Sequence, residues 1–160
     1  MIQFPGSRLI ISSLPAWLVI RTCLAGLDGT LAIEFGQKSR LGGYLNEWGD
    51  LVSDLALYTP ILLTIFGGAI TVFVFVLIIA TELVGLTSEW IGAGRRLEGP
   101  LGKVDRAIVF GAVATWYAIT ALTPPWPNFE ILAVAILMII TITNRICFAR
   151  AELARARLAK

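Results

Sequence analysis

Four side chains that could bind a metal or exchange a proton lie within apolar stretches of this chain: Asp28, Asn46, Asp50 and Asp54. Charge at membrane depth is costly, so acids in such positions are candidates for function. Asn46, Asp50 and Asp54 follow one another at intervals of four residues and therefore share one face of a helix. Oxygen ligands of this kind suit a hard ion such as Mg²⁺, Mn²⁺ or Ca²⁺. An ion bridging carboxylates and a substrate phosphate is a common arrangement for phosphoryl-type transfer.

Arg21 gives the same acids a second interpretation. It precedes Asp28 by seven residues and shares its helix face, and the short connection to the next helix pairs the two helices antiparallel. Asp28 is then expected opposite Asn46 and Asp50, roughly 10–15 Å below the cytoplasmic surface at a rise of 1.5 Å per residue. In the structural interpretation, Arg21 and the acids form ion pairs between helices. The spacing leaves both interpretations open.

The composition indicates an integral membrane protein. Of the 160 residues, 57% are hydrophobic and 15% are charged, and the mean hydropathy is +0.80. A soluble domain of this size carries roughly 25% charged residues. Much of the surface must therefore be apolar and face lipid.

Several classes of site are excluded by the residue types. The chain has no histidine, so no Ser-His-Asp triad, Cys-His dyad or histidine-ligated metal is available. Cys23 and Cys147 are too few for a disulfide framework and are expected to be small packing residues. The net charge of +2 argues against a nucleic-acid partner.

The elements that carry these residues are predicted to be helices. Charge-free runs are long and lack the alternating pattern of a membrane barrel. Leu55–Thr81 is too long for one straight crossing of a core about 30 Å thick, and Gly67-Gly68 divides it into two helices. The prediction is a single all-α, polytopic membrane domain over residues 1–160 with about five spanning helices. They are placed near residues 12–34, 40–66, 69–91, 103–122 and 127–158.

The distribution of basic residues predicts the orientation. Lysines and arginines gather in the first loop, the third loop and the C-terminal segment: Lys38, Arg40, Arg95, Arg96, Lys103, Arg106, Arg145, Arg150, Arg155, Arg157 and Lys160. The turns at Gly67-Gly68 and at 123–128 carry none. By the positive-inside rule, the basic loops, the C-terminus and the acid cluster face the cytoplasm of a bacterial-type inner membrane, and only Arg8 disagrees.

Lys103 and Arg106 open the fourth predicted helix. They are candidates for contacts to the phosphate of an acceptor molecule, although the positive-inside bias alone also explains them. Glu82, within the third predicted helix, is expected to pair with one of these bases.

The motif around the acids resembles the signature of the CDP-alcohol phosphatidyltransferases, D-x2-D-G-x2-A-R-x8-G-x3-D-x3-D. The segments Ala25-Gly-Leu-Asp28-Gly29-Thr-Leu-Ala32-Ile33 and Gly42-Gly-Tyr-Leu-Asn46-Glu-Trp-Gly-Asp50 follow its spacing without a gap. The signature residues that match are Asp28, Gly29, Ala32, Gly42 and Asp50. The resemblance in helix pattern covers most of the chain.

The resemblance implies a transferase that moves a phosphatidyl-type group from a CDP-linked lipid to an acceptor alcohol and releases CMP. It implies Mg²⁺ or Mn²⁺ as cofactor, a homodimer, and a six-helix fold of which this chain would lack the first helix. Asp28 would then be a metal ligand and Asp50 the general base, while Gly29, Ala32 and Gly42 would border the nucleotide.

Three signature positions differ in this chain. Ala25 replaces the first aspartate, Ile33 the arginine, and Asn46 the third aspartate. Asn46 can still offer an amide oxygen and Asp54 can supply a carboxylate, so the expected metal ligands are Asp28, Asn46, Asp50 and Asp54. The loss of two carboxylates predicts weaker metal binding, because affinity for hard ions depends on ligand charge.

Two functions are therefore predicted. The first is a metal-dependent transferase of phospholipid synthesis. The second is a catalytically inactive family member that serves as a lipid-binding or assembly subunit of a larger membrane complex. The acceptor alcohol is not indicated by the sequence.

Overall fold

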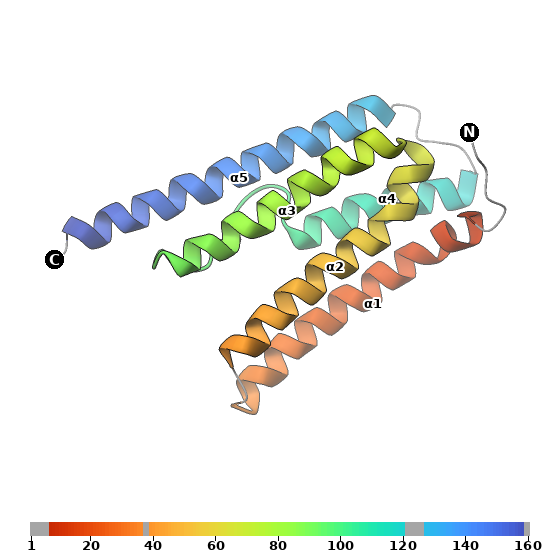
Figure 1. Ribbon diagram of the computed structural model, residues 1–160. Helices are drawn as coiled ribbons and strands as arrows, with labels where there is room; N and C mark the ends of the chain where they lie inside the picture. Colours follow the sequence, from red (N-terminus) through yellow and green to blue (C-terminus); the bar gives the residue numbers. More distant parts are fainter. Residues whose placement is uncertain (1–6, 37–38, 121–126, 159–160) are drawn as a thin grey trace. The chain divides into compact units, whose positions relative to one another are not determined.

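The computed structural model describes residues 7–36, 39–120 and 127–158, and the described part contains helices and their connections but no strand. The helices are α1 (Ser7–Glu34), α2 (Arg40–Ile65), α3 (Gly68–Trp90), α4 (Lys103–Thr120) and α5 (Pro127–Leu158) (Figure 1). This confirms the predicted all-α fold, and most boundaries agree closely with the prediction. The first helix differs most, since it begins at Ser7 rather than near residue 12. Most of the predicted turn at 123–128 lies outside the described residues.

Three helices of the described chain are long and apolar enough to cross a membrane: Ile10–Leu31 within α1, all of α3, and α5. The sequences of α2 and α4 are interrupted by charged residues, among them Asp50 and Asp54 in α2 and Arg106 in α4. The chain is an all-α membrane protein in which the charges of α2 and α4 require partners within the protein.

The chain divides into two compact units. The first unit comprises Met1–Thr71 and Ala107–Pro125, and so holds α1, α2 and most of α4. The second unit comprises Val72–Arg106 and Trp126–Lys160, and so holds nearly all of α3, the following loop, the first turn of α4, and α5.

In the first unit, α1 and α2 contact each other and lie side by side and antiparallel (Figure 1). Ser39 caps α2, because its side chain accepts a hydrogen bond from the N–H of Gly42 at 3.0 Å. From α4, Phe110 packs its ring against Tyr58 of α2, with ring centroids 4.4 Å apart. Tyr58 and Phe110 are both buried, so the core of this unit forms where these helices meet.

The turn between α2 and α3 is the one predicted at Gly67-Gly68. Gly67 has a φ of 85°, a conformation that side chains with a Cβ rarely adopt. The N–H groups of Phe66 and Gly67 both donate to the carbonyl of Leu62, at 2.9 and 3.1 Å, and so close the last turn of α2.

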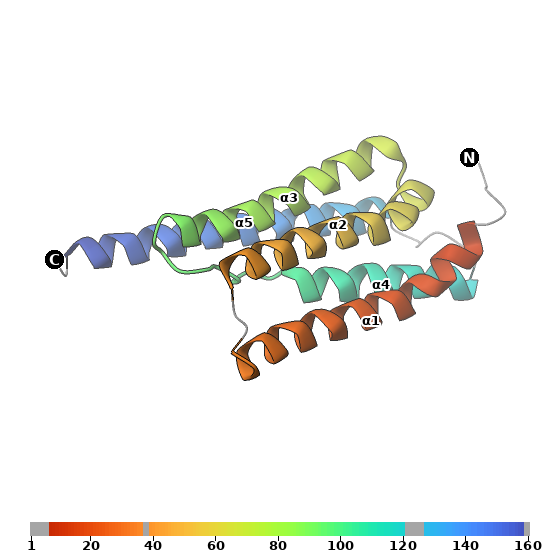
Figure 2. The same cartoon turned by 60° about the horizontal axis from the view of Figure 1, so that its bottom comes forward.

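In the second unit, α5 lies beside α3 and extends past it toward the C-terminus (Figures 1 and 2). One stripe of α5 is buried, and its members are Ile131, Val134, Ala135, Met138, Thr141, Arg145 and Ala149. With 32 residues, α5 is about 48 Å long at 1.5 Å per residue, which exceeds a hydrocarbon core of about 30 Å.

Cys23 and Cys147 are free thiols at exposed positions. The expectation that they pack inside the protein is therefore wrong. Both lie on helices long and apolar enough to span a membrane, α1 and α5, where a small, weakly polar thiol is tolerated at an exposed position.

Candidate functional site

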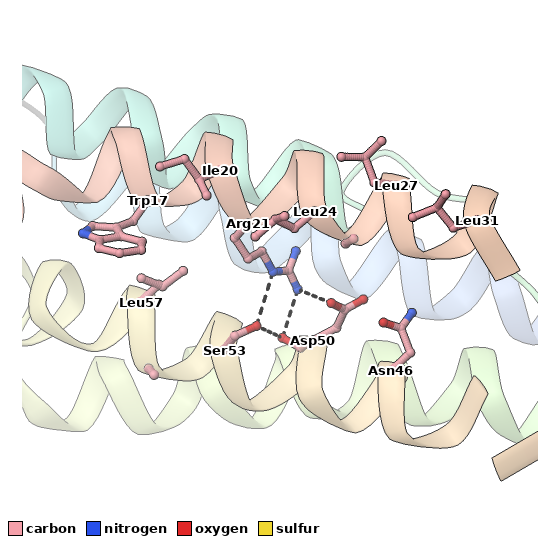
Figure 3. A pocket seen from close by; sticks show the side chains of 12 residues that line it. Trp17, Ile20, Arg21, Leu24, Leu27, Leu31, Asn46, Asp50, Ser53 and Leu57 are labelled. Carbon is pink, nitrogen blue, oxygen red and sulfur yellow. Dashed lines mark hydrogen bonds and ion pairs between the residues drawn. The ribbon is translucent and has the colours of Figure 1, made fainter. Parts of the chain in front are cut away.

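A pocket of about 730 Å³ opens between α1 and α2 in the first unit (Figure 3). Its polar lining consists of Arg21, Asn46, Asp50 and Ser53. The rest of the lining is apolar and comprises Trp17, Ile20, Leu24, Ala25, Leu27, Leu31, Ala56 and Leu57. The pocket thus combines a small polar region with long apolar walls, a lining suited to a lipid-like molecule.

Arg21 reaches from α1 to several acceptors on α2 (Figure 3). Its Nη2 lies 2.8 Å from Oδ1 of Asp54 and 3.3 Å from Oδ1 of Asp50. The same nitrogen donates to the backbone carbonyl of Asp50 at 3.0 Å, and Nε donates to Oγ of Ser53 at 3.3 Å. The structural interpretation of the sequence is therefore correct for Arg21, Asp50 and Asp54.

The helical spacing of α2 explains why one guanidinium reaches all these groups. Ser53 and Asp54 follow Asp50 by three and four residues, so the three side chains lie on one face. The Ser53 hydroxyl also donates to the carbonyl of Asp50 at 2.9 Å. Burial strengthens the ion pairs, because the side chains of Arg21, Asp50 and Asp54 are only 13%, 14% and 1% exposed.

The described residues do not fit a divalent metal site. Among them, no group of three or more aspartates, glutamates or cysteines lies close enough to hold an ion. The carboxylates of Asp50 and Asp54 instead face the Arg21 guanidinium. Asn46 lines the pocket on the same face of α2. Asp28 lies on α1, but its side chain is outside the described residues.

The small residues of the signature lie on both helices. Ala25 lines the pocket, where the signature has an aspartate. Gly29 is exposed on α1 with open space around it, and the side chain of Ala32 lies outside the described residues. A Cβ on Gly42 would come within 2.9 Å of Oγ of Ser39. Gly42 therefore makes room for the cap of α2, and its predicted nucleotide contact stays a prediction.

In the second unit, Lys103 and Arg106 both face Glu82. Nη2 of Arg106 lies 2.5 Å from one carboxylate oxygen of Glu82, and Nζ of Lys103 lies 4.0 Å from the other. The pairing expected for Glu82 is thereby confirmed. Arg106 is fully buried, so Glu82 supplies the negative charge that its guanidinium requires.

Arg145 is a buried residue whose role the sequence did not reveal. It is 2% exposed and donates to two backbone carbonyls, that of Thr81 at 2.6 Å and that of Glu98 at 3.2 Å. The positive-inside pattern placed it among the cytoplasmic bases. Arg145 follows Thr141 by four residues and precedes Ala149 by four, so the three share one helix face. This spacing was the sequence signal that could have indicated the burial of Arg145.

The loop after α3 is held by a second set of charges. Arg96 forms ion pairs with Glu98 and with Glu152 of α5. The hydrogen bond from Arg96 holds the pKa of Glu98 below its ordinary value of 4.5, against a smaller opposing effect of burial. The N–H of Leu101 donates to Oγ1 of Thr141 at 3.0 Å and ties the end of this loop to α5.

Comparison with known proteins gives one curated relative. The chain is 37% identical over 149 residues to the inner membrane protein YnbA of Escherichia coli (strain K12), a match that covers 91% of this chain and 73% of that protein. No family model and no solved structure matches the chain. The similarity to an inner membrane protein agrees with the apolar helices and supports a membrane location.

Proposed function

We propose a transferase function for this chain, which belongs to the family of the inner membrane protein YnbA. The proposed reaction moves a phosphatidyl-type group from a CDP-linked lipid to an acceptor alcohol. The observation that carries the proposal is the pocket between α1 and α2, which lies at the segments that resemble the CDP-alcohol phosphatidyltransferase signature. Ala25, Asn46 and Asp50 occupy three signature positions, and all three line it.

The pocket offers each part of such a donor a suitable surface. Leu24, Leu27 and Leu31 form an apolar strip along α1 against which acyl chains can pack. The polar groups of Asn46 and Asp50 lie across from this strip on α2 (Figure 3). A lipid headgroup would therefore meet polar atoms while its chains stay in apolar surroundings.

Asp50 is the residue proposed to carry the proton transfer. Its carboxylate accepts the proton of the acceptor hydroxyl as that oxygen bonds to the phosphorus of the phosphatidyl group. The bond from this phosphorus to the bridging oxygen of the donor then breaks, and CMP leaves. Because the described residues do not fit a metal pair, no step is assigned to a divalent ion.

The test is CMP release from CDP-diacylglycerol by the purified chain, with glycerol 3-phosphate, inositol and serine as acceptors. Release by the wild-type chain and its loss in Asp50→Asn are the expected results. Glu89→Gln is the matched control, since it removes an exposed carboxylate on α3 and should leave release unchanged. Absence of release with every acceptor would contradict the proposal.

The contacts of Arg21 favour a second candidate, a catalytically inactive lipid-binding or assembly subunit. The carboxylates of both Asp50 and Asp54 are engaged in ion pairs with the guanidinium rather than left open to an acceptor hydroxyl. In this case the chain would retain lipid through purification, detected by native mass spectrometry, and would co-purify with other membrane subunits. Asp50→Asn would then change neither result.

The proposed orientation places the C-terminus in the cytoplasm. It is supported by the basic residues of the last helix, among them Arg150, Arg155 and Arg157. A C-terminal alkaline phosphatase fusion, which is active only outside the cytoplasm, should be inactive, and a fluorescent-protein fusion at the same point should be bright. The reverse pair of results would contradict the orientation.

A further inference from the structure

The contacts of Arg21 identify what neutralises the acids of α2. We propose that Arg21 is the resident counter-ion of Asp50 and Asp54 and that it excludes a divalent cation from these two carboxylates. The inference rests on the proposed function only for the choice of cation, because a divalent ion is what the signature resemblance implies at this pocket.

The guanidinium of Arg21 lies against both acids of α2. Nη2 of Arg21 lies within 3.3 Å of one carboxylate oxygen of each acid. A cation that bridged Asp50 and Asp54 would bind the same two carboxylates and would lie close to this guanidinium. Arginine keeps its charge under all ordinary conditions, so the repulsion between the two cations is not relieved by loss of a proton.

Neutral groups of α2 hold the guanidinium as well. The backbone carbonyl of Asp50 and the hydroxyl of Ser53 accept hydrogen bonds from Arg21 at 3.0 and 3.3 Å. These acceptors fix its direction, and the side chain is only 13% exposed. Displacement of the guanidinium by a metal would cost these hydrogen bonds.

The residue one turn beyond Arg21 is an alanine. Ala25 lines the pocket at the signature position of the first aspartate and offers no oxygen ligand. A carboxylate there would have added a negative charge beside the guanidinium and favoured a second cation. With alanine at this place, the wall next to Arg21 contributes no ligand.

The test is direct titration of the detergent-purified full chain with Mn²⁺, with free Mn²⁺ followed by electron paramagnetic resonance. The wild-type chain should show no saturable binding in the range where Arg21→Gln binds, a difference of roughly tenfold or more in affinity. Asp50→Asn added to Arg21→Gln should abolish the gained binding. Arg150→Gln, which removes an exposed arginine of α5, is the matched control and should behave as the wild type.

Two results would overturn the inference: equal Mn²⁺ affinity in the wild-type and Arg21→Gln chains, or no binding to either. Arg21→Met, which keeps an aliphatic side chain without the charge, serves as the second variant if Arg21→Gln does not fold. CMP release, measured on the same samples, is a separate readout. If Arg21→Gln gains Mn²⁺ binding and no chain releases CMP, this inference is supported and the transferase proposal is contradicted. If the wild-type chain releases CMP and the two chains bind Mn²⁺ equally, the transferase proposal is supported and this inference is contradicted.

Discussion

Arg106 and Glu82 form a fully enclosed ion pair within the second unit, with Nη2 of the arginine 2.5 Å from Oε1 of the glutamate. The arginine has no exposed surface and the glutamate side chain is 6% exposed. Each charge is therefore the main compensation for the other in a region where water is scarce.

Breaking this pair should destabilise the protein strongly. Glu82→Leu alone leaves the buried Arg106 without its carboxylate, so we expect the free energy of unfolding to fall by about 3–5 kcal/mol. Arg106→Met should cost less, because Glu82 keeps the more distant Lys103 at 4.0 Å. The double variant should lose much less than the sum of the two. Unfolding of the purified chain by titration with sodium dodecyl sulfate in mixed micelles measures all three, and additive losses would contradict the pairing.

Gly99 allows the loop after α3 to approach α5. Its φ is 133°, and an added Cβ would come within 2.4 Å of Cγ2 of Thr141. Gly99→Ala should therefore lower the free energy of unfolding by about 1–3 kcal/mol through backbone strain alone, and by more through the clash. Gly49→Ala is the control: it lies within α2 with open space around it, so alanine should stabilise by up to about 1 kcal/mol. Equal melting temperatures for the two variants would contradict this account.

The hydroxyl of Thr141 accepts the hydrogen bond of a buried backbone N–H. Thr141→Val keeps the shape but leaves the N–H of Leu101 without this acceptor, and we expect a loss of about 1–3 kcal/mol. Thr143→Val is the matched control, because Thr143 is exposed and its hydroxyl bonds only the carbonyl of Ile139 in its own helix. Thermal unfolding should separate the two, and similar melting temperatures would show that the loop does not depend on this bond.

The loop charges predict a small dependence of stability on pH. The pKa of Glu98 is lowered in the folded chain by the hydrogen bond from Arg96, so its ionised form stabilises the fold. This contribution is present in full above the ordinary value of 4.5 and is lost as the pH falls through the lowered folded pKa. The effect is small because Glu98 is exposed to solvent. Hydrogen exchange of the 91–102 loop, measured at pH 6 and at pH 3 and corrected for the intrinsic exchange rate at each pH, should show lower protection at pH 3, and Glu98→Gln should reduce the difference.

Much of the fold could be predicted from the sequence because its signals are local. Charge-free runs placed the helices, and Gly67-Gly68 marked the turn between α2 and α3. Glu82 was expected to pair with Lys103 or Arg106, since an acid within an apolar helix needs a basic partner.

Other features depend on tertiary contacts that no spacing specifies. The helix faces allowed Arg21 to approach either Asp28 or the acids of α2, and only the packing of α1 on α2 places its Nη2 beside Asp50 and Asp54. The burial of Arg145 was hidden for a similar reason. Its partners are backbone carbonyls of Thr81 and Glu98. Every residue has a backbone carbonyl, so the residue types do not indicate which ones accept a hydrogen bond.

The pairing of Arg21 with acids on the very next helix has a consequence for how the chain enters a membrane. An arginine near the middle of an isolated spanning helix costs about 2.5–3.5 kcal/mol on insertion scales. Because Asp50 and Asp54 follow in the adjacent helix of the same hairpin, their charges become available as soon as α2 has been synthesised. Biogenesis of the first unit is thus expected to proceed through the α1–α2 hairpin as one insertion unit, with the ribosome delivering both halves before α1 leaves the translocon.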